Sequence, residues 1–401
     1  MILTGGENAG TLAAGRALRV AGFEPWNLVT GNAGLNLLAR SRACAGSLSA
    51  PGPAGCPRGF VRGLVDAAER LAAVAVLPGT ESAMLALAGT EPEFPDRVAV
   101  GACSLETTER ALAKEGVARI AEAVGLDTPR WEMVQGGGWE GGFPCVVKPP
   151  RSELRTPDGL LVRHSVQYVR DPIELERALA TLPGHRGLVE EYVPGRLHAI
   201  AGVFWEGRLV CAVHHAADRI WRPRCGVMAY ARTIPPDHEL EAGVSELLLR
   251  LGWQGVFQLQ FIHDGTTRLA IDLNPRFYES MGLTIAAGTN VPAIWMQLLL
   301  GQTPDIKPYR VGVRFRNETR DPRAILNLAR RGHKAKALAA ALPRRHTTHP
   351  VLAASDPYPF IVTGHKLIGR IRRAGPRENG AVHASSASSP NGFRARFPAG
   401  S

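Results

Sequence analysis

Three polar side chains alternate along a short apolar stretch in the second half of the chain. The stretch reads LAIDLNPRF at residues 269–277, and it holds Asp272, Asn274 and Arg276 two residues apart. Residues at this spacing point to the same face of a β-strand. Carboxylate and amide oxygens are ligands that Mg²⁺ prefers, often together with substrate phosphates, and a guanidinium binds phosphate or carboxylate. The pattern therefore predicts a face suited to a metal ion and an anion.

A second stretch, GVFQLQFIHD at residues 255–264, places Gln258 and Gln260 on one face in the same way. The Asp-Gly pair at its end is typical of a tight hairpin turn, so we expect the two stretches to pair antiparallel, with Gln260 near Asp272. Two interpretations stay open from these residues alone. One is a metal and phosphate site, and the other is a solvated sheet face with a surface ion pair.

The whole stretch QFIHDGTTRLAIDLNPRF resembles the metal-binding strand pair of the ATP-grasp superfamily, which includes biotin carboxylase, D-alanine–D-alanine ligase and carbamoyl phosphate synthetase. The usual pattern is an acid on the first strand and E-x-N-P-R on the second. By this resemblance Gln260, Asp272 and Asn274 hold Mg²⁺, with Mn²⁺ as an alternative, and Arg276 holds an acyl phosphate or a substrate carboxylate. Gln260 stands where the first acid is usual, which leaves one less negative charge for a second metal ion.

Two lysines resemble the nucleotide-binding lysines of the same superfamily, and they occur in the expected order along the chain. The segment FPCVVKPP resembles the strand whose lysine, here Lys148, contacts the α-phosphate. The segment LAKEGVARIAEAVGLDTP resembles a helix that opens with a nucleotide-binding lysine, here Lys114. The superfamily usually has Asp before that lysine, whereas this chain has Ala113. For either residue, an ordinary exposed lysine is the alternative.

The segment LVEEYVPG resembles the hinge strand that holds adenine. The resemblance implies that Glu190, with Glu191 beside it, binds the adenine amino group and that the backbone of Val193 contacts the ring. An acid that grips the ribose often follows this hinge, and here that role is vacant or falls to His198. The alternative for the two glutamates is an acidic strand end in water.

Two basic segments complete the resemblance. The loop at residues 149–165 stands where the superfamily carries a mobile loop that covers the phosphates, and it is polar and basic here. In the segment ADRIWRPRCG, Arg219 stands where the superfamily places a basic residue against the γ-phosphate or the acyl phosphate. An ordinary surface loop is the alternative for the first segment.

The fold class expected from the resemblance and from local patterns is α/β followed by α+β. Strand-like and helical segments alternate over the first hundred residues, which is typical of a parallel sheet. We therefore expect a Rossmann-like pre-ATP-grasp domain at residues 1–103 and an ATP-grasp domain at 104–306. A basic helical extension at 307–373 and a disordered tail at 374–401, rich in Ser, Ala, Gly and Pro, are expected to follow.

The formal net charge of +11 is concentrated in residues 307–373, which hold 16 Lys and Arg residues against three acids. Such a segment can pack on the rest of the protein and attract anionic substrates, lie on an anionic membrane surface, or bind nucleic acid. Its few aromatic residues argue against nucleic acid. Packing is the favoured interpretation, and peripheral membrane contact through 307–373 is the alternative.

The remaining composition is that of a soluble cytoplasmic protein. No apolar run reaches the roughly 20 residues that a membrane span needs. The six cysteines form no C-x-x-C pair, which favours reduced thiols over disulfides or a zinc site. The first residues lack a signal-peptide pattern.

The function implied by the resemblance is ATP-dependent ligation. A small-molecule carboxylate would attack the γ-phosphate, giving an acyl phosphate and ADP, and an amine would then form the amide bond. The alternative is a nucleotide-binding protein without turnover, whose basic segment binds an anionic partner or a membrane. A homodimer is compatible with either function, and neither substrate can be read from the sequence.

Overall fold

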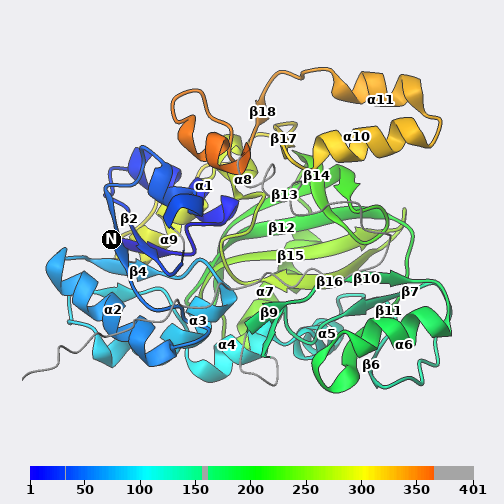
Figure 1. The fold of residues 1–401 in the computed structure, drawn as a ribbon, viewed down its shortest axis with the longest axis horizontal. Helices are drawn as coiled ribbons and strands as arrows, with labels where there is room; N and C mark the ends of the chain where they lie inside the picture. Colours follow the sequence, from blue (N-terminus) through cyan, green and yellow to red (C-terminus); the bar gives the residue numbers. More distant parts are fainter. Residues whose placement is uncertain (32, 156–160, 365–401) are drawn as a thin grey trace, which may run out of the picture.

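The computed structural model describes residues 1–31, 33–155 and 161–364 of the chain (Figure 1). The predicted tail at 374–401 and the middle of the loop at 149–165 lie outside these ranges. The described residues form a parallel sheet, a small antiparallel sheet, a large central sheet and a two-stranded hairpin.

The N-terminal sheet is parallel, with the strand order β3-β2-β1-β4-β5. Its strands are β1 (Ile2–Thr4), β2 (Trp26–Val29), β3 (Gly46–Ser49), β4 (Ala75–Leu77) and β5 (Ala99–Val100), and its helices are α1 (Ala9–Val20), α2 (Pro57–Arg70) and α3 (Glu81–Leu87). This arrangement confirms the predicted Rossmann-like fold of the first hundred residues. The turn after β4 comes so close to β1 that a Cβ at Gly79 would lie 2.2 Å from the carbonyl oxygen of Thr4. The direction of strand addition reverses between β1 and β4, which marks the edge where such sheets bind ligands.

A small antiparallel sheet follows, with the order β10-β7-β11-β6 (Figure 1, lower right). Its strands are β6 (Trp131–Gln135), β7 (Cys145–Lys148), β10 (Gln167–Val169) and β11 (Arg186–Glu191), its helix is α6 (Pro172–Ala180), and the helices α4 (Leu105–Leu112) and α5 (Lys114–Ala123) lead into it. The hairpin of β8 (Glu153–Arg155) and β9 (Leu161–Arg163) is inserted between β7 and β10. It occupies the segment predicted to cover the phosphates.

The central sheet has seven strands in the order β16-β15-β12-β13-β14-β17-β18. Its strands are β12 (Arg196–Trp205), β13 (Arg208–Trp221), β14 (Val227–Thr233), β15 (Gly255–His263), β16 (Arg268–Asn274), β17 (Arg314–Arg316) and β18 (Thr347–Thr348). The predicted hairpin of β15 and β16 is confirmed, with Gln260 opposite Asp272 and Gln258 opposite Asn274. A register shift just after Gln260 marks a bulge in this pair.

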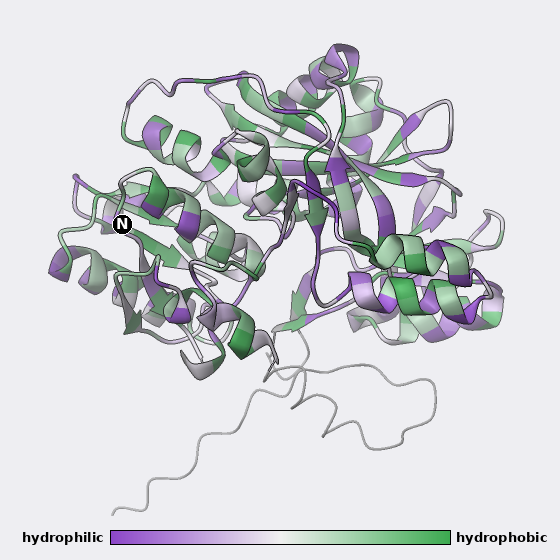
Figure 2. Ribbon diagram, turned by 90° about the horizontal axis from the view of Figure 1, so that it is seen from above, coloured by the Kyte–Doolittle hydropathy of each residue, from purple (hydrophilic) through white to green (hydrophobic). Residues whose placement is uncertain are grey.

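The helix α7 (His238–Leu251) covers one face of the central sheet. It buries four residues, Val244, Leu247, Leu248 and Leu251, in one core with Phe257, Leu259 and Phe261 of β15. Full burial of a side chain of this size stabilises the fold by roughly 1.5–3 kcal/mol. Because side chains alternate along β15, its two glutamines must face away from α7. The surface helices carry both green and purple segments in Figure 2, as expected when one side of a helix is buried.

The helices α8 (Met281–Ala287) and α9 (Val291–Leu299) join the central sheet to the N-terminal domain. Both contact α1, and one shared core includes Leu12, Tyr278 and Trp295. The two domains are therefore packed against each other and not merely linked.

The basic segment after residue 306 is less helical than the sequence suggests. It contains the predicted helices, α10 (Asp321–Arg330) and α11 (Lys334–Ala341), but β17 and β18 extend the central sheet. These strands of three and two residues are too short to show a periodic pattern, and tertiary pairing decides them. Among the described helices, none combines the length and apolar character needed to cross a membrane.

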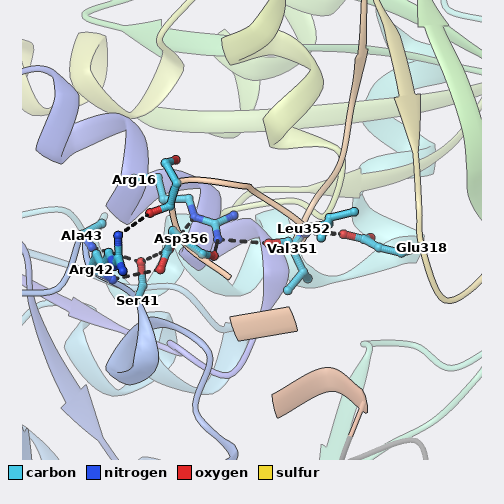
Figure 3. Close-up of polar contacts among 9 residues, drawn as sticks. Arg16, Ser41, Arg42, Ala43, Glu318, Val351, Leu352 and Asp356 are labelled. Atoms are coloured by element: carbon cyan, nitrogen blue, oxygen red, sulfur yellow. Dashed lines mark hydrogen bonds and ion pairs between the residues drawn. The ribbon is translucent and has the colours of Figure 1, made fainter. Parts of the chain in front are cut away.

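The last described segment returns to the N-terminal domain and is anchored there by Asp356 (Figure 3). Its carboxylate accepts hydrogen bonds from Ser41 Oγ at 2.6 Å, the Arg42 amide at 3.0 Å and Arg16 Nε at 2.9 Å. Asp356 is only 6% exposed. Burial alone would raise the pKa of this carboxyl, but these donors hold it below its ordinary value.

We predict that Asp356→Asn lowers the free energy of unfolding by about 2 kcal/mol, because it removes a buried, charge-assisted network. The depressed pKa means that the contribution is present above the ordinary carboxyl pKa of about 4 and is lost as the pH falls through the folded value. The difference between variant and parent, measured by urea unfolding, should therefore shrink in acid.

The matched control is Asp305→Asn, because Asp305 pairs with Lys307 at 3.1 Å on the open surface. We expect that change to cost less than about 0.5 kcal/mol. Equal losses for the two variants would contradict the anchor.

Candidate active site

The predicted metal ligands lie together on the face of the central sheet that turns away from α7. Gln258 Oε1 accepts long hydrogen bonds from Gln260 Nε2 at 3.4 Å and from Asn274 Nδ2 at 3.5 Å. Asn274 Nδ2 also lies 3.4 Å from Asp272 Oδ2. Bonds of this length are weak, so little energy holds the amide groups in these orientations. One carboxylate and several amide groups are thus gathered on one surface.

Buried hydrogen bonds orient Gln258 on this face. Gln258 Nε2 donates to Ser280 Oγ at 2.8 Å and lies 3.3 Å from His215 Nε2. Burial lowers the pKa of His215 to about 4, so the ring is neutral near pH 7. The sequence did not single out His215 and Ser280. Only the register of β12 with β13 and β15 shows that His215 shares a face with the glutamines.

Two lysines reach the same region from the smaller sheet and its leading helix. Lys114, the first residue of α5, forms an ion pair with the Asp272 carboxylate. Burial alone would lower the pKa of Lys114, but the charge of Asp272 raises it. In the same way, burial would raise the pKa of Asp272, but Lys114 and Lys148 lower it. The two groups therefore hold each other in the charged state.

The second lysine forms a buried ion pair of its own. Lys148, the last residue of β7, lies 2.5 Å from the Glu190 carboxylate and donates to the carbonyl oxygen of Ile271 at 2.7 Å. Burial raises the pKa of Glu190, and the positive charge of Lys148 opposes that rise. Because Ile271 belongs to β16, this lysine ties the smaller sheet to the edge of the central sheet.

A cavity opens beside the edge strand β16. It is lined by the charged residues Lys114, Glu190 and Asp272 and by apolar residues that include Val117, Trp131 and Leu259. Its lining therefore combines an apolar surface with the charged groups of the two lysine–carboxylate pairs.

One protein-family profile and several solved structures are similar to this chain. The profile of a family described as "ATP-grasp in the biosynthetic pathway with Ter operon" matches residues 185–320, which include the hinge strand β11 and the β15–β16 hairpin. No curated protein matches the chain by sequence. The L-amino acid ligase from Bacillus licheniformis has a similar structure, with a TM-score of 0.55 and 16% identity over 75% of this chain and 73% of its own.

Two further solved structures show the same fold. Biotin carboxylase from Campylobacter jejuni, in complex with β,γ-ATP, aligns with a TM-score of 0.58 and 14% identity, over 78% of this chain and 74% of its own. N5-carboxyaminoimidazole ribonucleotide synthetase from Thermus thermophilus aligns with a TM-score of 0.55 and 19% identity, over 77% of this chain and 79% of its own. Residues 185–320 thus match an ATP-grasp family, and the chain has the fold of ATP-grasp proteins.

The predicted metal ligands would supply Mg²⁺ with few negative charges. Among the described residues, no group of three or more His, Cys, Asp or Glu gathers as a metal cage. The set offers one carboxylate, Asp272, together with the amide oxygens of Gln260 and Asn274. Such a set suits a Mg²⁺ ion that takes its remaining ligands from phosphates and water.

The residues predicted to form an adenine-binding hinge lie at the end of β11 in different environments. Glu190 is buried and already paired with Lys148, whereas Glu191 is exposed and Val193 is half-buried in the segment that follows. His198 lies opposite Phe261 in the sheet, so its ring points to the α7 side and stacks on His263 with centroids 5.0 Å apart. The structure therefore does not bring His198 to the face that carries Gln260.

Arg219 also lies apart from the metal set, three strands away from β16 on β13. Its guanidinium makes two hydrogen bonds to the fully buried Asp321, at 2.6 and 2.9 Å, and covers the ring of Tyr230. Arg316 pairs with the same carboxylate at 3.1 Å. Arg219 thus helps to hold α10 on the sheet, and its proposed contact with phosphate stays a prediction.

Arg276 lies just beyond β16 and contacts a residue that the sequence did not single out. Its Nε donates to Glu81 Oε1 at 3.2 Å, and Glu81 is buried whereas Arg276 is half-buried. Glu81 is the first residue of α3 in the N-terminal domain. Glu81 could have been identified in the sequence by its position after a Gly turn at the carboxyl end of β4, where such sheets bind ligands.

We predict that Lys148→Met lowers the free energy of unfolding by about 3 kcal/mol, because it leaves the Glu190 carboxylate buried without its partner. The loss should grow as the pH rises above about 4, the ordinary pKa of a glutamate, because only the ionised form is strained by burial. Adding Glu190→Gln should restore part of the stability in a denaturant titration.

A matched control is Arg250→Met on α7, which removes an exposed ion pair with Glu246. That change should cost less than about 0.5 kcal/mol. A double variant as unstable as the sum of its two single changes would contradict a direct coupling between Lys148 and Glu190.

Proposed function

We propose that this ATP-grasp protein is an ADP-forming ligase that activates a carboxylate as an acyl phosphate and couples it to an amine. The observation that carries the proposal is the meeting of Lys114, Lys148 and Asp272 where the smaller sheet touches β16. The neighbouring L-amino acid ligase is named for chemistry of this class.

The two lysines are the groups suited to triphosphate. In the structure their charges are balanced by Asp272 and Glu190. Phosphate oxygens would replace these carboxylates as partners of the lysines, so the site exchanges one set of ion pairs for another. Such an exchange avoids leaving either lysine buried without a counter-charge.

Asp272, Asn274 and Gln260 would hold Mg²⁺. When bound, this ion neutralises negative charge on the phosphates, which is the main requirement for phosphoryl transfer. Lys114, freed from Asp272, would neutralise further phosphate charge. Arg276 would hold the substrate carboxylate, and later the acyl phosphate, in position for attack by the amine.

The residues after 306 are proposed to serve the fold. Asp321 and Asp356 anchor this segment to the central sheet and to the N-terminal domain. These contacts support the packing interpretation over a segment held free for a membrane. Vesicle binding by the intact protein, lost when exposed Lys334 and Lys336 are changed to glutamine, would favour the membrane interpretation instead.

We predict that ATP binding measured by calorimetric titration requires Mg²⁺ and weakens at least about tenfold in Asp272→Ala, a loss of about 1.4 kcal/mol or more. The reason is that this variant removes the one carboxylate of the metal set. Asp305→Ala, which removes an exposed acid, should bind ATP as the parent does. Binding that is unaffected by both Mg²⁺ and Asp272→Ala would contradict the metal assignment.

Turnover is tested with carboxylic acids, Mg-ATP and hydroxylamine, a small amine that traps an acyl phosphate as a hydroxamate. We expect ADP and hydroxamate to appear in equal amounts, because the carboxylate attacks the γ-phosphate. Release of AMP would contradict the proposed chemistry. ATP binding without turnover would favour the nucleotide-binding alternative.

A further inference from the structure

Gln258 lies between the predicted metal ligands and a buried histidine. It is buried on β15, on the face of the sheet that carries those ligands. His215 belongs to β13, and β12 separates it from β15. Its ring nevertheless reaches Gln258, because the side chains of β12 that lie between them are those of Ala199 and Ala201. Two small residues thus leave room for a contact across a whole strand.

The two ring nitrogens of His215 have different roles. Nδ1 lies 3.4 Å from the carbonyl oxygen of Val213, which can only accept a hydrogen bond, so Nδ1 carries the proton. Burial lowers the pKa of His215 to about 4, so the ring has one N–H group near pH 7. Nε2 must therefore accept a hydrogen bond. Ser280 Oγ and Gln258 Nε2 both lie 3.3 Å from it.

Ser280 connects His215 to Gln258. It directly precedes α8, a position where a serine usually caps the helix by accepting from an amide of the first turn. In the described structure its hydroxyl makes no such cap and instead accepts from Gln258 Nε2 at 2.8 Å. The hydroxyl proton is then available to His215 Nε2. The serine therefore gives up a stabilising cap for a contact with the metal face.

The other end of the Gln258 amide group faces the predicted metal ligands. Its Oε1 accepts from Gln260 Nε2 at 3.4 Å and from Asn274 Nδ2 at 3.5 Å. These bonds are long, so the shorter bond to Ser280 decides which way the Gln258 amide points. An amide that offers its nitrogen to Gln258 keeps its own oxygen free for a cation. In the reverse orientation two oxygens would face each other.

We propose that His215 and Ser280 are positioning residues for the metal set. Through Gln258 they turn the side-chain oxygens of Gln260 and Asn274 toward the place proposed for Mg²⁺. This relay, from His215 through Ser280 to Gln258, rests on the proposed function, because Mg²⁺ binding is itself part of that proposal. It acts on how tightly the ion is held and not on the chemical step.

The test measures the Mg²⁺ concentration that half-saturates ATP binding in a calorimetric titration. Gln258→Met keeps the size of the side chain and removes its oxygen. We expect the Mg²⁺ requirement to rise about threefold to tenfold, the loss expected for one or two weak hydrogen bonds. Gln258→Glu keeps an acceptor beside the two amides, so its requirement should stay below that of Gln258→Met. A role in packing alone predicts the reverse order, because a buried site accepts methionine more readily than a carboxylate.

Ser280→Ala interrupts the relay at its middle and should also raise the Mg²⁺ requirement about threefold or more. The matched control is Thr284→Val, which removes a buried hydroxyl from α8 that lies 3.2 Å from Tyr278 Oη. The control should lower stability in urea by a similar amount and leave the Mg²⁺ requirement at the parent value. If Gln258→Met does not fold, Ser280→Ala and this control decide the question.

A parent-like Mg²⁺ requirement in Gln258→Met and Ser280→Ala would overturn the relay and leave the ligase proposal intact. Equal increases in Ser280→Ala and Thr284→Val would overturn it as well, because the loss of any buried hydroxyl would then suffice. ATP binding by the parent that does not depend on Mg²⁺ would contradict the metal assignment and the relay together. The ADP and hydroxamate assay tests the ligase proposal separately.

Discussion

Buried charged side chains at the centre of this molecule need partners of opposite charge. Lys148 and Glu190 are both almost fully buried, and neither could remain charged there alone. They pair within the smaller sheet, and the hydrogen bond from Lys148 to Ile271 joins that sheet to the edge of the central sheet. Lys114 and Asp272 repeat this arrangement one step closer to the metal face. The cavity beside β16 is lined by Lys114, Glu190 and Asp272 of these two pairs.

The same pairs explain how a site for a highly charged ligand can be stable before the ligand arrives. Each lysine is paired with a carboxylate where a phosphate would bind under the proposed function. The glutamines on β15 add polar groups to the site without adding charge. Gln260 stands opposite Asp272, where a second acid would strengthen metal binding but would also need another counter-charge. The site therefore balances its own charges, and under the proposed function a ligand would enter by exchanging partners.

Local patterns predicted the parts of the site that depend on neighbouring residues. The pairing of Gln260 with Asp272 follows from strand alternation and an Asp-Gly turn, whereas Lys114 and Lys148 were singled out only by the resemblance to the ATP-grasp superfamily. Contacts between distant segments could not be read in this way. Glu81 and Arg276 are 195 residues apart, and their contact depends on how two domains pack. The side to which His198 points depends on the register of β12 with β15, and the partner of Arg219 lies in a segment that looked wholly helical.

The anchor at Asp356 has a consequence for how the molecule can move. The chain passes from the central sheet back to the first helix and is fastened there to Arg16, Ser41 and Arg42. Together with the core shared by α1, α8 and α9, this fastening joins the N-terminal domain to the central sheet at two places. The N-terminal domain and the central sheet can therefore separate only if both the Asp356 contacts and this shared core are broken.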